Sequence, residues 1–199
     1  MTDLILASGS PVRRALLEAA GKRFPVRKPQ VDEVALRAAL EQDQNSPRDM
    51  SDALADFKAR RVAAKYPTSV VLAADQVLEF EGRAIGKSGT QEQAADLLDR
   101  LQGSRHQLHS ASVIYENGKT VWRHVGTAML TMRPMSKDAI HRYLSRHWVD
   151  VSYCVGHYRI EAEGVRLFQR IDGDYFNVLG IPLLPTLNYL TDRGFLDDD

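Results

Sequence analysis

The sequence predicts an α/β protein built on a mixed β-sheet. Short apolar runs that are typical of strands alternate with segments whose apolar residues recur at helical spacing. Some neighbouring strand-like runs are instead joined by tight turns, most clearly at Asn117-Gly118, a dipeptide that favours hairpins. The sheet should therefore contain both parallel and antiparallel pairs. The chain of 199 residues shows no repeat and no linker, and we predict a single domain over residues 1–199.

The N-terminal half is expected to contain three strands and two helices. Its first and third strands are apolar runs, and the third is followed by Glu81-Gly82, a turn signal. Pro11 and Gly21 bracket the first helical pattern, and Pro67 ends the second. The expected elements, in order, are a strand at Leu4–Ala7, a helix from Pro11 to Ala20, a strand at Phe24–Arg27, a helix from Ser46-Pro47 to about Ala64, and a strand at Ser69–Phe80.

The C-terminal half is expected to continue the alternation. Gly103 stops an amphipathic helix, and Ser136 is a suitable N-cap for another. Glu163-Gly164 is placed as the turn of a strand pair. The expected elements are a helix at Thr90–Leu101, strands at Gln107–Tyr115 and Thr120–Met132, a helix at Ser136–Arg146, the strand pair within Tyr158–Ile171, and a helix at Leu183–Thr191.

Composition narrows the classes of function. Lys plus Arg and Asp plus Glu both number 26, and this balance argues against a broad nucleic-acid-binding face. Cys154 is the single cysteine, so no internal disulfide forms, and it has no thiol-activating context. The N-terminal residues lack a basic region and a long apolar run, so neither a signal peptide nor a membrane span is expected. We expect a cytoplasmic protein.

The segment Leu4–Gly21, LILASGSPVRRALLEAAG, places small polar residues and two arginines between a strand and a helix. A helix N-terminus favours anions, Gly9 permits close backbone approach, and arginine pairs well with phosphate oxygens. The segment is equally consistent with a capped helix that carries surface arginines. It is not a P-loop, because it lacks Gly-Lys-Ser/Thr.

Three further places carry charged residues suited to chemistry. Asp75 lies inside the apolar run Ser69–Phe80, where a carboxylate is costly unless it is paired, bound to a metal or placed at a strand end. Lys87 follows the predicted hairpin, which turns it back toward Asp75. Glu33 belongs to the acidic pair Asp32-Glu33 after a predicted strand. Taken singly, Lys87 is better explained as a solvated lysine, and Glu33 as part of an ordinary loop.

Taken in order, these pieces resemble the Maf family of nucleoside triphosphate pyrophosphatases. The motifs that carry the resemblance are LASGSPVRR, VDE, Phe57-Lys58-Ala59, AADQ, GK, LQGSRHQ, VGHYRIE and GDYFNVLGIPL, and they span Leu4 to about Leu190. The resemblance implies an elongated mixed sheet in two lobes around a central cleft, flanked by helices, as in inosine-triphosphate pyrophosphatases. It also implies hydrolysis between the α- and β-phosphates of a nucleotide, assisted by Mg²⁺ or Mn²⁺.

The resemblance also implies roles for individual residues. Asp75 matches the proton acceptor, and Glu33 matches an acidic position linked to the metal. Ser8, Ser10 and Arg13 match the phosphate loop. Lys58 and Lys87 match two lysines of the cleft, which would steady charge on the phosphates and the leaving pyrophosphate. A homodimer is a family expectation, and a regulatory nucleotide-binding role in cell division or septum formation is the alternative function.

Base recognition in this family is linked to three positions, which are Val12, Gln76 and Glu161 here. A branch that prefers dTTP and UTP tends to have Arg, Thr and Gln at these positions. A branch that prefers 7-methyl-GTP tends to have Trp, Gln and Glu. Gln76 and Glu161 match the second branch and Val12 matches neither, so a 7-methyl-GTP-like substrate and a pyrimidine triphosphate both stay open.

Overall fold

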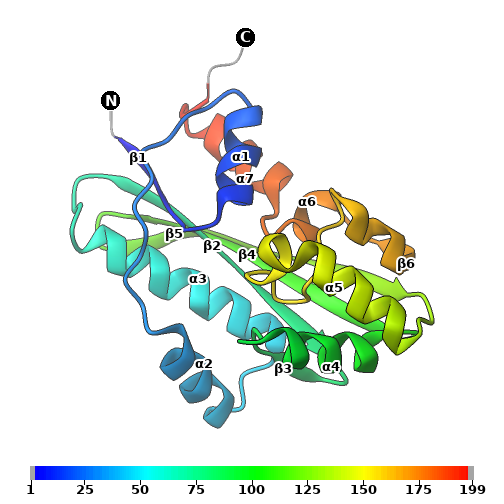
Figure 1. Cartoon of the computed structure of the whole chain (residues 1–199). Coiled ribbons are helices and arrows are strands. Elements are labelled where there is room, and N and C mark those ends of the chain that lie inside the picture. Colours follow the sequence, from blue (N-terminus) through cyan, green and yellow to red (C-terminus); the bar gives the residue numbers. More distant parts are fainter. Residues whose placement is uncertain (1–2, 197–199) are drawn as a thin grey trace.

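A computed structural model describes residues 3–196; the first two and last three residues of the predicted domain lie outside it. Within this range one mixed sheet forms the centre of the molecule (Figure 1), in the order β1-β2-β4-β5-β6, with β3 also paired to β2. β1 lies parallel to β2 and the other pairs are antiparallel, which confirms the predicted mixed sheet. The strands are β1 (Leu4–Ala7), β2 (Val70–Phe80), β3 (Arg83–Ile85), β4 (Arg105–Glu116), β5 (Lys119–Met132) and β6 (Phe168–Asp172).

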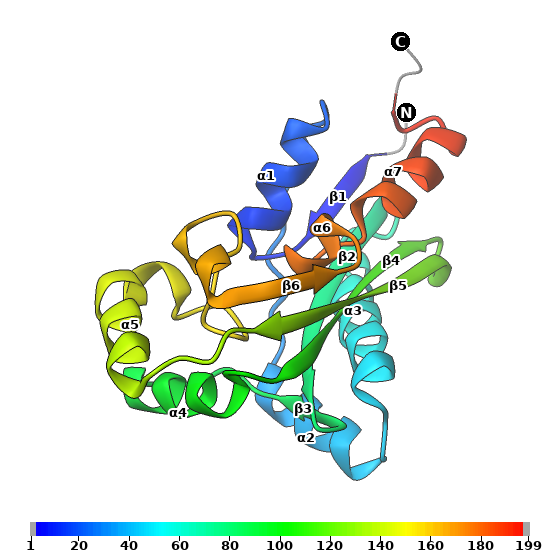
Figure 2. The same cartoon turned by 90° about the vertical axis from the view of Figure 1, so that its right-hand side faces the viewer.

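Helices cover both faces of this sheet (Figures 1 and 2). α3 packs along one face, with Ala55 and Ala59 against Val71 and Ala73. On the other face α1 and α7 form one apolar cluster, and α4 and α5 form a second at the far end of the long strands. No helix within residues 3–196 is both long and apolar enough to span a bilayer. The helices are α1 (Pro11–Ala19), α2 (Glu33–Gln42), α3 (Pro47–Ala63), α4 (Gln91–Leu101), α5 (Lys137–Val151), α6 (Tyr175–Val178) and α7 (Leu183–Asp192).

The outer edge of β2 is only partly covered. β1 pairs with β2 as far as Ala73, and β3 begins its pairing at Leu78. Residues 74–77 therefore have no strand partner on this edge of β2. Because side chains alternate along a strand, Asp75 lies on the α3 face with Val71 and Ala73, and Gln76 lies on the opposite face. This gap in strand pairing is where Asp75 and Gln76 become available to a ligand.

Two of the strand predictions, one for a single strand and one for a strand pair, are wrong or incomplete. Phe24–Arg27 forms no strand, and Val26 makes a single isolated bridge to Leu6. Tyr158–Ile171 is not a strand pair, because residues 163–167 form a 3₁₀ helix and the strand β6 begins at Phe168. The backbone of Arg159 approaches Gly164 so closely that an added Cβ would lie 2.6 Å from the Arg159 carbonyl oxygen. Gly164 thus marks a close approach of two chain segments and not a hairpin turn.

Helix α2 was not anticipated by the sequence pattern. Asp32, expected in a loop, caps this helix by accepting a hydrogen bond from the backbone N–H of Ala35 at 3.0 Å. Glu33 is the first helical residue. The helix has no fully buried residue, so its apolar stripe is weak, but its Ala, Leu, Glu and Arg content strongly favours helix.

His106 should make stability depend on pH. It is 2% exposed, its Nε2 lies 2.7 Å from the Tyr158 hydroxyl, and burial lowers its pKa from 6.5 to about 4. Between these two values the unfolded chain binds a proton that the folded chain does not. The free energy of unfolding should therefore be highest above pH 6.5 and fall as the pH drops, by roughly 2 kcal/mol between pH 6.5 and 5.

Urea unfolding at pH 7 and pH 5 measures this effect. In His106→Gln the drop between the two pH values should shrink by that amount, whatever the absolute stability of the variant. His141→Gln, which changes an exposed histidine of α5, is the matched control and should keep the wild-type pH dependence. Equal pH dependence in all three proteins would show that His106 is not the group responsible.

Candidate active site

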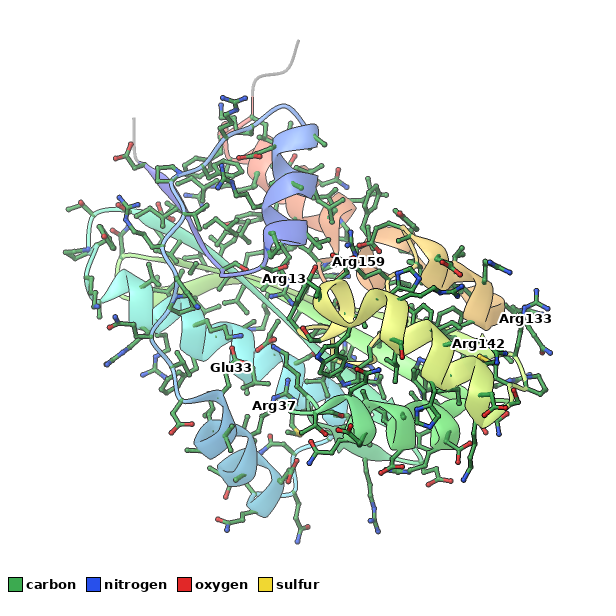
Figure 3. The ribbon with its side chains drawn as sticks, in the orientation of Figure 1. Arg13, Glu33, Arg37, Arg133, Arg142 and Arg159 are labelled. Atoms are coloured by element: carbon green, nitrogen blue, oxygen red, sulfur yellow. The ribbon has the colours of Figure 1, made fainter. Side chains whose placement is uncertain are left out.

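A pocket of about 470 Å³ opens at the gap in the β2 edge. Its walls come from the β1–α1 loop, from α2 and α3, and from the segment that follows α5. The labelled Arg13, Glu33, Arg37 and Arg159 lie near the middle of the molecule in Figure 3, whereas Arg133 and Arg142 lie toward the right-hand edge of the view. Every residue predicted for the site lines the pocket: Ser8, Ser10, Val12, Arg13, Glu33, Lys58, Asp75, Gln76, Lys87 and Glu161.

The loop between β1 and α1 is both a helix cap and a pocket wall. Oγ of Ser10 caps α1 by accepting from the Arg13 backbone N–H at 3.3 Å, and Oγ of the buried Ser8 accepts from the Ser10 N–H at 3.1 Å. In both hydroxyls the hydrogen stays free to be donated. Together with the helix N-terminus, these donors form a surface suited to an anion. The residues that cap the helix are thus the same ones that the family resemblance assigns to a phosphate loop.

The guanidinium of Arg13 is fixed by two backbone carbonyls. Its Nε donates to Gly180 at 2.7 Å and its Nη1 donates to Ala74 at 2.8 Å. Gly180 has a φ of +101°, and an added Cβ would lie 3.3 Å from Nε, so this position requires glycine. Burial lowers the pKa of Arg13, while Asp75 and Glu33 oppose the shift. Two of its five N–H groups are used, and the others are available to a ligand in the pocket.

Lys58 lies between two carboxylates. Its Nζ is 2.7 Å from Oε1 of Glu33 and 2.9 Å from Oδ2 of Asp75. Lys58 and Asp75 are buried, at 6% and 5% exposure, whereas the Glu33 side chain is 37% exposed. Burial alone would raise the pKa of Asp75, but the charges of Lys58, Arg13 and Arg37 outweigh it and hold that pKa below its usual value. Asp75 is therefore an ionised carboxylate that can accept a proton.

Lys87 completes the charged group less tightly. Its Nζ lies 4.0 Å from Oε2 of Glu33, and its side chain is 54% exposed. The predicted turn at Glu81-Gly82 does bring Lys87 back to the pocket that Asp75 lines. The loose pairing leaves its ammonium group free to follow a charge that enters the pocket.

The residues present fit a divalent cation that shares its ligands with a substrate. Oδ2 of Asp75 is buried and accepts no hydrogen bond of good geometry, although Nζ of Lys58 is close. Such an oxygen keeps lone pairs for a cation. No group of three His, Cys, Asp or Glu side chains within residues 3–196 is placed to hold a metal. Glu33 and Asp75 would need phosphate oxygens as further ligands, which is the usual manner for Mg²⁺.

The three positions that the family resemblance links to base recognition, Val12, Gln76 and Glu161, line the same pocket as the apolar residues Leu108, Ile160 and Val178. Nε2 of Gln76 is fixed by the Asn177 and Val178 carbonyls at 2.9 and 3.0 Å, so its carbonyl oxygen is the group left for a ligand. The side chain of Val12 is apolar and half-buried.

Glu161 accepts from Nε of Arg159 at 2.8 Å, so its carboxylate already has a cationic partner. Cys154 also lines the pocket, and burial and the charge of Glu161 raise the pKa of its thiol to about 11. The thiol is therefore protonated at neutral pH, as expected for a cysteine without thiol-activating neighbours.

Sequence reasoning missed three basic residues near the site. Arg159 and Lys28 line the pocket, and Nη2 of Arg37 lies 3.3 Å from the Gln76 carbonyl oxygen. Arg37 follows Glu33 by four residues on α2, a spacing that places both on one helix face. That spacing could have indicated Arg37 if the helix had been anticipated.

Comparisons with known proteins agree with the motif resemblance. Curated relatives include a "Nucleoside triphosphate pyrophosphatase" of Ruegeria pomeroyi, 50% identical over 98% of both chains. Another is a "7-methyl-GTP pyrophosphatase" of Rhizobium meliloti, 44% identical over 98% of both chains. Among solved structures, a HAM1 protein from Coxiella burnetii aligns with 66% of this chain and 73% of its own, at 17% identity and a TM-score of 0.42. The family model "Maf-like protein" matches residues 3–193, and the chain belongs to this family.

Proposed function

We propose that this protein is a nucleoside triphosphate pyrophosphatase, a hydrolase that cleaves the bond between the α- and β-phosphates of a nucleotide. The observation that carries the proposal is the ionised Asp75 beside Lys58 and Glu33 in a pocket rimmed by an anion-binding loop. Relatives of nearly full coverage are named for this activity. No comparable support exists for the regulatory alternative in cell division.

The chain's own residues suit the three tasks of the reaction, which are to neutralise phosphate charge, to hold the phosphates and to accept a proton from water. A triphosphate carries about three to four negative charges, which cationic side chains must neutralise. The Ser8–Arg13 loop and Lys87 would hold the phosphates. Asp75 would take a proton from the attacking water, whose oxygen then bonds to the α-phosphorus as the bond to the bridging oxygen breaks. Pyrophosphate leaves with the bridging oxygen, and the nucleoside monophosphate remains.

A divalent cation, Mg²⁺ or Mn²⁺, is proposed as the cofactor. Glu33 and Asp75 would hold it, on the grounds of the buried Oδ2 of Asp75, which pairs with Lys58 but accepts no hydrogen bond of good geometry. When bound, such an ion neutralises phosphate charge and lowers the pKa of water.

A nucleotide panel tests the function directly. The purified protein is incubated with Mg²⁺ or Mn²⁺ and each of ATP, GTP, UTP, dTTP and 7-methyl-GTP, and both pyrophosphate and orthophosphate are measured. Pyrophosphate and monophosphate in equal amounts are expected from at least one nucleotide. Orthophosphate would identify a phosphatase instead, and binding without any product would identify a nucleotide-binding protein.

Val12→Trp should move the preference toward 7-methyl-GTP. An indole in the pocket wall can stack on the cationic methylated base, an interaction worth about 0.5–2 kcal/mol, or roughly 2- to 30-fold in kcat/KM relative to UTP. Steady-state kinetics with both nucleotides measure the ratio. Val149→Trp, on an 85% exposed position of α5, is the control. An unchanged ratio in Val12→Trp would mean that this position does not contact the base.

Two wider expectations accompany the proposal. A homodimer follows from the family resemblance, and a cytoplasmic location follows from the single cysteine and from the proposed role in nucleotide metabolism. Both stay predictions, and sedimentation velocity of the purified chain would test whether it forms a homodimer.

A further inference from the structure

The gap in the β2 edge is spanned by two arginines. The outward carbonyl oxygen of Ala74 accepts from Nη1 of Arg13 at 2.8 Å, and that of Gln76 accepts from Nη2 of Arg37 at 3.3 Å. These carbonyls stand on either side of Asp75 along the strand. The guanidinium groups thus satisfy edge acceptors that β1 and β3 leave unpaired, and they do so on both sides of the proposed proton acceptor.

Arg13 and Arg37 differ in where they can act. Arg13 lines the pocket and can reach a ligand, whereas Arg37 is not among the residues that line it. Arg37 comes from α2, which also carries Glu33 one turn earlier. Figure 3 shows Glu33 and Arg37 both projecting from α2 toward the centre of the molecule. The contact of Arg37 with β2 therefore bears on how Glu33 is placed.

Helix α2 has little else to hold it against the body. It contains no fully buried residue, and its half-buried Leu36 and Leu40 pack on the small cluster around Leu54. A helix with so few buried contacts belongs to the less stable parts of a fold. Its first residue, Glu33, forms an ion pair with Lys58, and one turn later Arg37 donates a hydrogen bond to the β2 backbone.

We propose that Arg37 is a positioning residue for hydrolysis, which seats α2 on the open edge of β2 and so holds Glu33 against Lys58 and Asp75. The inference rests on the proposed pyrophosphatase activity. Arg37 acts by holding Glu33 in place and by adding its positive charge near Asp75, and it does not line the pocket. Losing it should impair the chemical step more than nucleotide binding, because the loop that grips the phosphates lies on a different element.

The test compares Arg37→Gln and Arg37→Lys with wild type. Arg37→Gln should lower kcat by at least about tenfold while KM changes by less than about threefold. Arg37→Lys keeps a cationic donor for the Gln76 carbonyl and should recover most of kcat. Hydrogen exchange of the backbone amides in residues 33–42 should be faster in Arg37→Gln than in wild type. Arg48→Gln, at an exposed position near the start of α3, is the matched control and should leave all of these unchanged.

Distinct results would overturn the inference. An unchanged kcat in Arg37→Gln, or unchanged exchange in α2, would show that Arg37 does not seat the helix. A raised KM at constant kcat would place Arg37 on the substrate instead. If the wild-type protein hydrolyses no nucleotide at all, the proposed function fails, and the exchange measurement still decides whether Arg37 holds α2.

Discussion

Asp75→Asn is expected to lower turnover by at least about 100-fold, the usual size of a general-base contribution. The carboxylate is 5% exposed and flanked by Lys58 and Arg13, which keep its pKa low and the group ionised at neutral pH. An amide of the same shape cannot take a proton from water. Its oxygen can still accept the 2.8 Å hydrogen bond that Oδ1 receives from the Gln76 N–H, so the strand geometry should persist.

Nucleotide binding should survive this change. The grip on the phosphates comes from the Ser8–Arg13 loop and Lys87, and none of these residues is altered. Turnover is measured as pyrophosphate release, and binding is measured by calorimetry with an analogue that cannot be cleaved between the α- and β-phosphates. Asp96→Asn, on the exposed face of α4, controls for the loss of one surface charge. Wild-type turnover in Asp75→Asn would assign the proton acceptor to another group.

The elements that the sequence predicted well are those fixed by local signals. Pro11 starts α1 as expected, with Ser10 as its N-cap, and Asn117-Gly118 joins β4 to β5 with φ values of +50° and +79°. These residues act through their own backbone preferences, which need no distant partner. The long strand with Asp75 was likewise evident from its apolar run.

What the sequence could not predict depends on distant partners. The segment at Glu163-Gly164 has the composition of a turn, but its structure is decided by the approach of Arg159 and not by local preference. The role of Arg37 becomes visible only when β1 and β3 are known to leave part of β2 unpaired. Likewise, the pairing of Glu161 with Arg159 is a matter of side-chain geometry. The candidate site residues were predicted from ordered motifs, which indicate which residues belong to the site but not how their side chains are arranged.

Lys58→Met should cost both stability and activity. The ammonium group lies 2.9 Å from Asp75 and 2.7 Å from Glu33, and its removal leaves a buried carboxylate without this cationic partner. Breaking a buried ion pair from one side typically costs roughly 3–5 kcal/mol, and the exposure of Glu33 points to about 3 kcal/mol here. Turnover should fall as well, because Asp75 would gain a proton more readily and so lose its role as acceptor.

Urea unfolding in the absence of divalent ions measures the loss, with Lys65→Met as the control. Lys65 is exposed, and its Nζ donates only a long hydrogen bond of 3.4 Å to Oε1 of Gln30. The free energy of unfolding of Lys65→Met should therefore stay within about 0.5 kcal/mol of the wild-type value. Added Mg²⁺ should stabilise Lys58→Met more than wild type, because two carboxylates without a cation between them attract a divalent ion more strongly. Equal stability of the two lysine variants would mean that Lys58 is not the group that makes the buried charge of Asp75 tolerable. If Lys58→Met loses stability but Mg²⁺ does not restore it, the ion pair stabilises the fold, and the proposal that the same two carboxylates bind a metal fails.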